Sequence, residues 1–274
     1  MFPRASSNCQ LTKANNTMPL LRTLRALLLV TAIMLFPAIS SAQNQSDSLH
    51  RPFDAVLKAH VADGAVDYNG VAGDPRFAAY VKDLEQTDAQ KLSSRDERLV
   101  FWINAYNALA IQGILNGSSP KSFFGKIGFF YNDKYSVGGL VTNLYDLEHK
   151  ILRPLGEPRI HFAIVCASMS CPALRAEAFN VEHLDQQLED SARKFIIDPT
   201  RNRFDREKKL AELSKIFDWF DEDFEQHSGS VAQYVARYVG DPELAQELND
   251  GQYKIKYLEY LWGLNGTPAK AVKK

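Results

Sequence analysis

The chain has 274 residues, of which 45% are hydrophobic, 11% aromatic and 24% charged. These values lie near the average for globular proteins and exclude a collagen-like, a coiled-coil and a wholly disordered chain. Residues 1–42 hold four basic residues and no acidic one, so residues 43–274 keep 28 basic and 33 acidic residues and a net charge of −5. Nucleic acids and anionic membranes require a basic surface, so neither is expected as a partner.

The N-terminal segment differs in composition from the rest of the chain. After its basic residues comes an apolar run, Ala26–Ile39, which ends in the small residues Ser40–Ala42. This order predicts a secretory signal peptide over residues 1–42, with Met18 as an alternative start. The run of about 14 residues is shorter than the roughly 20 of a membrane span, and a retained anchor is the alternative. We expect an exported, soluble protein, periplasmic or secreted, with no stable membrane span after processing.

Residues 43–274 are expected to form a single globular domain, since one core suits this length. Hydrophobic periodicity, capping residues and breakers predict its elements in chain order. The predicted helices begin near Pro52 and then span 75–84, 94–116, 143–152, 180–195, 218–224 and 230–239. The predicted strands span 63–70, 135–137, 160–166 and 253–257. Without a regular strand–helix alternation, the predicted fold class is α+β, a helix-rich single domain packed on a small, mostly antiparallel sheet.

The clearest helix carries two asparagines on one face. Ser94 and Glu97 have the spacing of a capping box, and Gly117 supplies the stop. Asn104 and Asn107 are three residues apart within it, although asparagine is a poor helix former. Buried amides need partners, so we expect this face to meet the loop that follows residues 160–166. A polar stabilising role in a site is the alternative interpretation.

The densest set of reactive side chains falls within 24 residues: Glu148, His149, His161, Cys166 and Cys171. The first two lie near a helix end and the cysteines flank the end of the next predicted strand. A short connection lets these ends meet, so we expect all five around one concavity. In a straight strand, His161 and Cys166 lie about 17 Å apart, which favours His149 as the partner of the thiol. A bend would let His161 reach it.

The two cysteines have several interpretations. An exported protein favours a disulfide between Cys166 and Cys171. If Pro172 opens a helix, Cys171 caps it and the helix dipole favours a thiolate nucleophile. Metal ligation is disfavoured because the spacing between the two cysteines exceeds that of a zinc knuckle.

The acidic residues of 218–223 lack the spacing of a calcium loop and are expected to form a solvated face. Nucleotide-binding and serine-hydrolase motifs are absent, so no cofactor and no metal are expected.

Three ordered motifs resemble the family known as domain of unknown function 547. They are the helix segment 101–109, the segment 147–153, and the segment from His161 to Pro172 with its Ser-Cys-Pro ending. The resemblance extends over about 67–224, followed by a C-terminal segment at 225–265 and a frayed tail at 266–274. It implies relatives that include exported bacterial proteins, and no assigned biochemical role.

Two functional hypotheses follow, and the sequence leaves both open. In the first, the protein is a thiol-dependent hydrolase or acyl transferase acting on a small-molecule or peptide-like ligand. Its candidate residues are Cys171 as nucleophile, His149 or His161 as base, Glu148 as orienting acid, Asn104 or Asn107 as stabiliser, and Cys166 beside them. In the second, the protein is a non-catalytic binding or scaffold module with a structural Cys166–Cys171 disulfide. Thiol redox exchange ranks below both because the chain lacks C-x-x-C.

Overall fold

A computed structural model describes residues 36–267, with side chains from residue 48 onward. The chain divides into two units, Met1–Ala42 and Gln43–Lys274, and the second is described below. Most of the predicted signal peptide lies outside the described residues. Within residues 36–267, no helix combines the length and the apolar character needed to cross a membrane.

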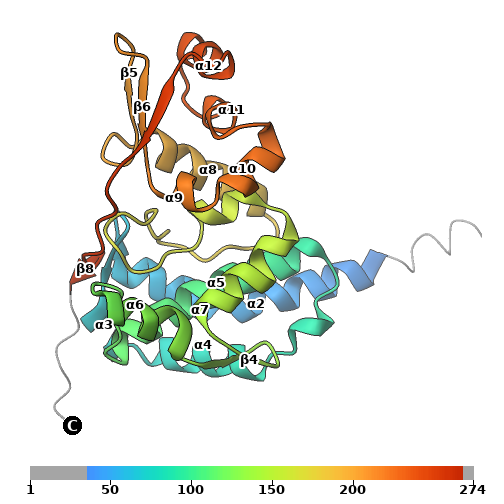
Figure 1. The fold of residues 1–274 in the computed structure, drawn as a ribbon. Helices are drawn as coiled ribbons and strands as arrows, with labels where there is room; N and C mark the ends of the chain where they lie inside the picture. Colours follow the sequence, from blue (N-terminus) through green and yellow to red (C-terminus); the bar gives the residue numbers. More distant parts are fainter. Residues whose placement is uncertain (1–35, 268–274) are drawn as a thin grey trace, which may run out of the picture. The chain divides into compact units, whose positions relative to one another are not determined.

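The first half of the domain is helical and is built around one long central helix, α5 (Figure 1). Its elements are α2 (Phe36–His60), β1 (Val61–Ala62), β2 (Ala65–Asp67), α3 (Tyr68–Gly73), α4 (Pro75–Gln86), η1 (Ala89–Lys91) and α5 (Arg95–Leu115). The predicted capping box is confirmed, since the Ser94 hydroxyl accepts the Glu97 amide at 3.1 Å and the Glu97 carboxylate accepts the Ser94 amide at 3.0 Å. All side chains from Leu99 to Ile111 are buried, so α5 contacts neighbours on every face.

The middle of the chain consists of short elements: α6 (Phe123–Ile127), η2 (Gly128–Asn132), β3 (Tyr135–Val137), β4 (Leu140–Thr142), α7 (Leu144–Asp146), η3 (Leu147–Leu152), η4 (Arg153–Leu155) and η5 (Pro158–Phe162). Asn143 caps α7 as predicted, because its side chain accepts the Asp146 amide at 2.7 Å. The helix then continues as η3 with π-helical hydrogen bonding. Such bulges often occur at functional sites, and η3 carries Glu148 and His149.

The remaining elements are α8 (Leu184–Ile197), β5 (Arg203–Asp205), β6 (Leu210–Leu213), α9 (Ile216–Trp219), α10 (Asp221–Ser228), α11 (Val231–Ala236), α12 (Pro242–Asn249), β7 (Lys254–Tyr257) and β8 (Gly266–Thr267). Helix α8 begins four residues later than predicted. The Asn180 side chain instead accepts the amide of His183, which holds a turn before the helix.

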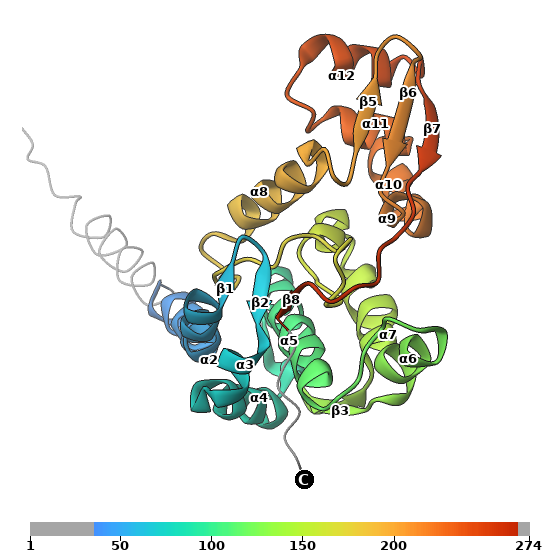
Figure 2. The same ribbon diagram turned by 90° about the vertical axis from the view of Figure 1, so that its left-hand side faces the viewer.

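The described strands form three small sheets, with the orders β1-β2-β8, β3-β4 and β5-β6-β7. The α+β class is confirmed, but two of these sheets are mixed, because β2 pairs with β8 and β6 with β7 in parallel. Gly266 and Thr267, expected to begin a frayed tail, form β8 instead. We call residues Leu258–Asn265, which connect β7 to β8, the C-terminal strap. Figure 2 shows it running from the β5-β6-β7 sheet to the β1-β2-β8 sheet.

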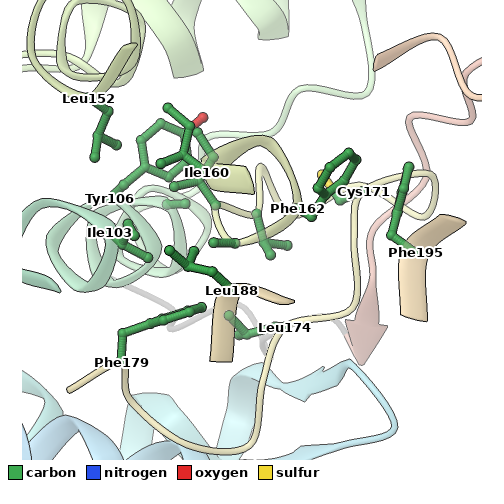
Figure 3. Packing of buried hydrophobic residues seen from close by; sticks show 14 of the residues in the cluster. Ile103, Tyr106, Leu152, Ile160, Phe162, Cys171, Leu174, Phe179, Leu188 and Phe195 are labelled. Carbon is green, nitrogen blue, oxygen red and sulfur yellow. The ribbon is translucent and has the colours of Figure 1, made fainter. Parts of the chain in front are cut away.

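The predicted strand 160–166 was wrong. Pro158 to Phe162 form the 3-10 helix η5, and residues 163–166 follow as irregular chain. A short apolar run does not distinguish a strand from other buried structure. Side chains from this region join the hydrophobic core, which also includes Cys171 (Figure 3).

Candidate active site

The five clustered residues line one cavity of about 320 Å³. Glu148 and His149 come from η3, His161 from η5, and Cys166 and Cys171 from the loop after it. The expected convergence is therefore confirmed. Other side chains of the cavity wall are mostly aromatic or apolar: Tyr106, Phe130, Tyr131, Tyr145, Ile164, Pro172, Ile216, Trp219, Phe220, Tyr260 and Trp262, together with Lys126.

The helical turn of η5 brings His161 into the cavity. Asn107 of α5 fixes the segment that follows, because its amide donates to the Ala163 carbonyl at 3.0 Å and accepts the Val165 amide at 2.8 Å. The 17 Å separation from Cys166 that a straight strand would impose therefore does not apply.

Asp223 of α10 orients the imidazole of His161. Its carboxylate lies 2.7 Å from His161 Nε2, and the ring stacks on Phe220 with centroids 3.9 Å apart. An ionised carboxylate only accepts hydrogen bonds, so Nε2 carries the hydrogen and Nδ1 keeps its lone pair. Nδ1 is buried, and no side chain or backbone group of the described structure hydrogen-bonds to it. The nearest carboxylate oxygen, Glu148 Oε1, is 3.8 Å away. This arrangement leaves a basic nitrogen unpaired at the cavity.

Arg153 also holds the Asp223 carboxylate. Its Nε and Nη2 atoms each donate to Asp223 at 2.8 Å. Burial raises the pKa of Asp223, but the hydrogen bonds from His161 and Arg153 outweigh it and hold the pKa well below its usual range. Burial lowers the pKa of His161, and Asp223 only partly offsets this. At neutral pH the pair is therefore an ionised carboxylate and a neutral imidazole.

Glu148 behaves in the opposite way to Asp223. Burial, with a smaller contribution from Cys166, raises its pKa to about 8. The Tyr106 hydroxyl, at 3.4 Å from Oε2, and the charge of Arg153 offset this only in part. At pH 7 Glu148 is mostly a neutral carboxylic acid, which both donates and accepts a proton.

The two cysteines are free thiols in this structure and share one tyrosine. The Tyr260 hydroxyl lies 3.1 Å from Cys171 Sγ and 3.3 Å from Cys166 Sγ. Burial raises the pKa of Cys171, but hydrogen bonds from Cys166, Tyr260 and two backbone amides outweigh it and lower the pKa. The hydrogen bond with Cys171, and then burial, raise the pKa of Cys166. Cys171 is therefore the sulfur that ionises first.

Pro172 does not open a helix, so the condition for Cys171 to act as a helix cap is not met; the chain there is irregular. The C-terminal strap supports the loop that carries Cys166 and Cys171. The Met169 amide donates to the Gly263 carbonyl at 2.7 Å, and the Leu261 amide donates to the Ser170 hydroxyl at 2.9 Å. From the other side, Arg201 donates twice to the Cys171 carbonyl, at 2.8 and 3.0 Å.

His149 occupies a different part of the cavity wall. Its ring stacks on Tyr145 with centroids 4.0 Å apart, and its Nδ1 lies 3.1 Å from the Tyr145 carbonyl. The prediction favoured His149 as the partner of the thiol. In the described structure neither histidine hydrogen-bonds to a cysteine, and only His161 has an orienting carboxylate.

Asn104 and Asn107 do not line the cavity. The Asn104 amide pairs with the backbone of Phe179 in both directions, at 2.8 and 2.9 Å, as Asn107 does with residues 163–165. Both amides are buried and paired with backbone as expected, but their partners differ from the prediction: Asn107 pairs with residues 163 and 165, within the segment predicted as a strand, and Asn104 pairs with Phe179, beyond the loop that follows it. Because both amides pair with backbone groups and do not line the cavity, we do not retain them as stabilisers of a reacting group. Among the described side chains, no cluster of three His, Cys, Asp or Glu residues is placed to hold a metal ion.

Sequence reasoning missed Asp223, Arg153 and Tyr260. Asp223 was assigned to a solvated acidic face, although its neighbours Phe220 and Phe224 could have indicated that part of α10 faces inward. Arg153 belongs to the motif segment 147–153, but no role in the site was predicted for it. Nothing local distinguishes Tyr260, which lies 89 residues from Cys171.

Residues 89–196 match the model of the family described as "Protein of unknown function, DUF547". This stretch contains all seven residues proposed from the sequence, and its similarity to this family is the one that the sequence motifs indicated. It is shorter than the expected family core at about 67–224. No curated protein and no solved structure matched the chain.

Proposed function

We propose that this protein is a thiol-dependent hydrolase or acyl transferase, with Cys171 as nucleophile and His161 as base. The observation that carries the proposal is the buried, unpaired Nδ1 of His161, in the same cavity as a thiol with a lowered pKa. Leaving a buried nitrogen unpaired costs on the order of 1–3 kcal/mol, and among the buried polar atoms without a partner in the described structure, His161 Nδ1 belongs to the only residue that lines this cavity. A general base, which accepts a proton from a reacting group during catalysis, explains an unpaired nitrogen there.

The reaction begins when Cys171 Sγ attacks the carbonyl carbon of an ester or amide. The thiol proton passes to His161 Nδ1 through the neutral carboxyl of Glu148, which accepts on one oxygen and donates from the other; for this transfer the 3.8 Å between Glu148 Oε1 and Nδ1 must shorten when substrate binds. Asp223 stabilises the imidazolium that forms. When the carbon–oxygen or carbon–nitrogen bond breaks, His161 returns the proton to the leaving group. Water or another acceptor then attacks the thioester, and Cys171 regains its proton.

The test is formation of an acyl-enzyme. The protein is incubated with p-nitrophenyl acetate and its intact mass is followed by mass spectrometry. The wild-type protein should gain one acetyl group on Cys171, while Cys171→Ala should gain none and His161→Ala should react at least about 100-fold more slowly. Cys166→Ala is the matched control and should still be acylated. Acylation of Cys171→Ala at the wild-type rate, with melting temperatures unchanged, would exclude this nucleophile.

We also propose that the protein is exported and processed near Ala42. The basic flank, the apolar run and the small residues 40–42 support this. The intact mass of the protein recovered from outside the cytoplasm should correspond to a chain beginning at or near Gln43. A mass that retains residues 27–36 would contradict it.

A further inference from the structure

The cavity has two aromatic walls. One, which we call the strap wall, consists of Trp219, Tyr260 and Trp262, with ring centroids 4.6–5.7 Å apart. The other, which we call the tyrosine wall, consists of Tyr131, Tyr145 and His149, stacked at 4.5 and 4.0 Å. All six residues line the same cavity. Two groups of aromatic rings in one cavity favour a ligand with a planar or aromatic body.

The strap wall connects the nucleophile to a lysine. At one end, the Tyr260 hydroxyl lies 3.1 Å from Cys171 Sγ. At the other end, Lys126 Nζ lies 3.9 Å from the centre of the Trp262 ring. A molecule lying along this wall with its carbonyl at Cys171 therefore extends toward Lys126.

Lys126 is the one fixed cation among the residues lining the cavity. It is half-buried, and in the described part of the chain no carboxylate lies within 4.0 Å of it, in contrast to Lys58 or Lys150, which pair with aspartates. The ionisable neighbours do not neutralise it, because Glu148, with a pKa of about 8, is mostly uncharged at pH 7. An anionic group of a ligand would supply the missing partner, and a charge-assisted hydrogen bond is stronger than a neutral one.

We infer that the site takes a monoanionic acyl compound: an aromatic body that lies on the strap wall, a carbonyl at Cys171, and a carboxylate that pairs with Lys126. The inference rests on the proposed function for the placement of the carbonyl. The pairing of an aromatic body with a carboxylate rests on the two walls and on Lys126.

The test measures binding alone, so that it does not depend on turnover. The probe is 3-phenylpropanoate, and its uncharged counterpart is 3-phenylpropan-1-ol; neither has a leaving group. Binding is followed by tryptophan fluorescence, since two of the three tryptophans of the chain line the cavity. The wild-type protein should bind the carboxylate about tenfold more tightly than the alcohol, as expected for one charge-assisted hydrogen bond.

Lys126→Met should abolish this preference and leave binding of the alcohol unchanged. Lys121→Met is the matched control, because Lys121 is exposed, lies five residues away and does not line the cavity; it should retain the preference. Trp262→Leu should lower the binding affinity for both the carboxylate and the alcohol. Equal affinities in the wild-type protein, an unchanged preference in Lys126→Met, or no binding of either probe would overturn the inference. If Cys171 is still acylated in those cases, the proposed function stands and only the substrate class is wrong.

Discussion

Replacing Glu148 by glutamine should change the pH dependence of stability. Glu148 and Glu157 are equally buried, each 8% exposed, but their surroundings differ. Burial raises the pKa of Glu148 from its usual 4.5 to about 8. Burial also raises the pKa of Glu157, but two hydrogen bonds from Arg159, at 2.7 and 3.0 Å, outweigh this and lower it. The two residues therefore form a matched pair with opposite shifts.

The size of the effect follows from proton linkage. Because the folded protein holds the Glu148 proton more tightly than the unfolded chain, its contribution to stability is complete below pH 4.5 and is lost as pH rises toward about 8. Within that window each pH unit costs the wild-type protein about 1.4 kcal/mol. Glutamine does not ionise, so Glu148→Gln should gain about 2 to 3 kcal/mol over the wild-type protein between pH 5 and pH 7. The melting temperature of Glu148→Gln, relative to that of the wild-type protein, should rise by about 5–10 °C between pH 5 and pH 7.

Urea unfolding of the wild-type protein and of Glu148→Gln at pH 5 and pH 7 measures how the stability difference between them changes with pH. The other titrating groups are common to both proteins, so their contributions cancel. Glu157→Gln should be destabilised at both pH values by a similar amount, since a lowered pKa affects stability only below about 4.5. A stability difference between Glu148→Gln and the wild-type protein that is the same at pH 5 and pH 7 would show that Glu148 is ionised in the folded protein. The assignment of a neutral proton carrier would then be wrong.

Two further predictions concern the framework of the site. Asn107→Leu should lower the free energy of unfolding by on the order of 2–4 kcal/mol in urea titrations, because it leaves two buried backbone groups without partners; a loss below 0.5 kcal/mol would contradict this role. Asp223→Asn should slow acylation of Cys171 by about 100-fold or more, since an amide can donate to His161 Nε2 and so favour the wrong tautomer. The control Asp221→Asn, two residues away and exposed, should react at the wild-type rate, and equal rates for both variants would refute the orienting role of Asp223.

The sequence alone determined the local structure around the site. Capping and periodicity identified α5, because the Ser94–Glu97 box and the apolar stripe are set by contacts three or four residues apart. The same reasoning placed the Asn143 cap. It also brought Glu148, His149 and the cysteines together, since a connection of a few residues limits how far their elements can separate.

Tertiary structure alone decided which groups pair and which carry charge. Asp223 contacts His161 across 62 residues and Arg153 across 70, and Tyr260 contacts Cys171 across 89. Which members of the acidic run at 218–223 face solvent depends on how α9 and α10 pack, and for Asp223 the deciding contacts are with His161 and Arg153, which are distant in sequence. The pKa of Glu148 depends likewise on burial by chain segments distant in sequence. Partner choice and desolvation are properties of the packed core, and for that reason the chemistry of this site became visible only in the folded protein.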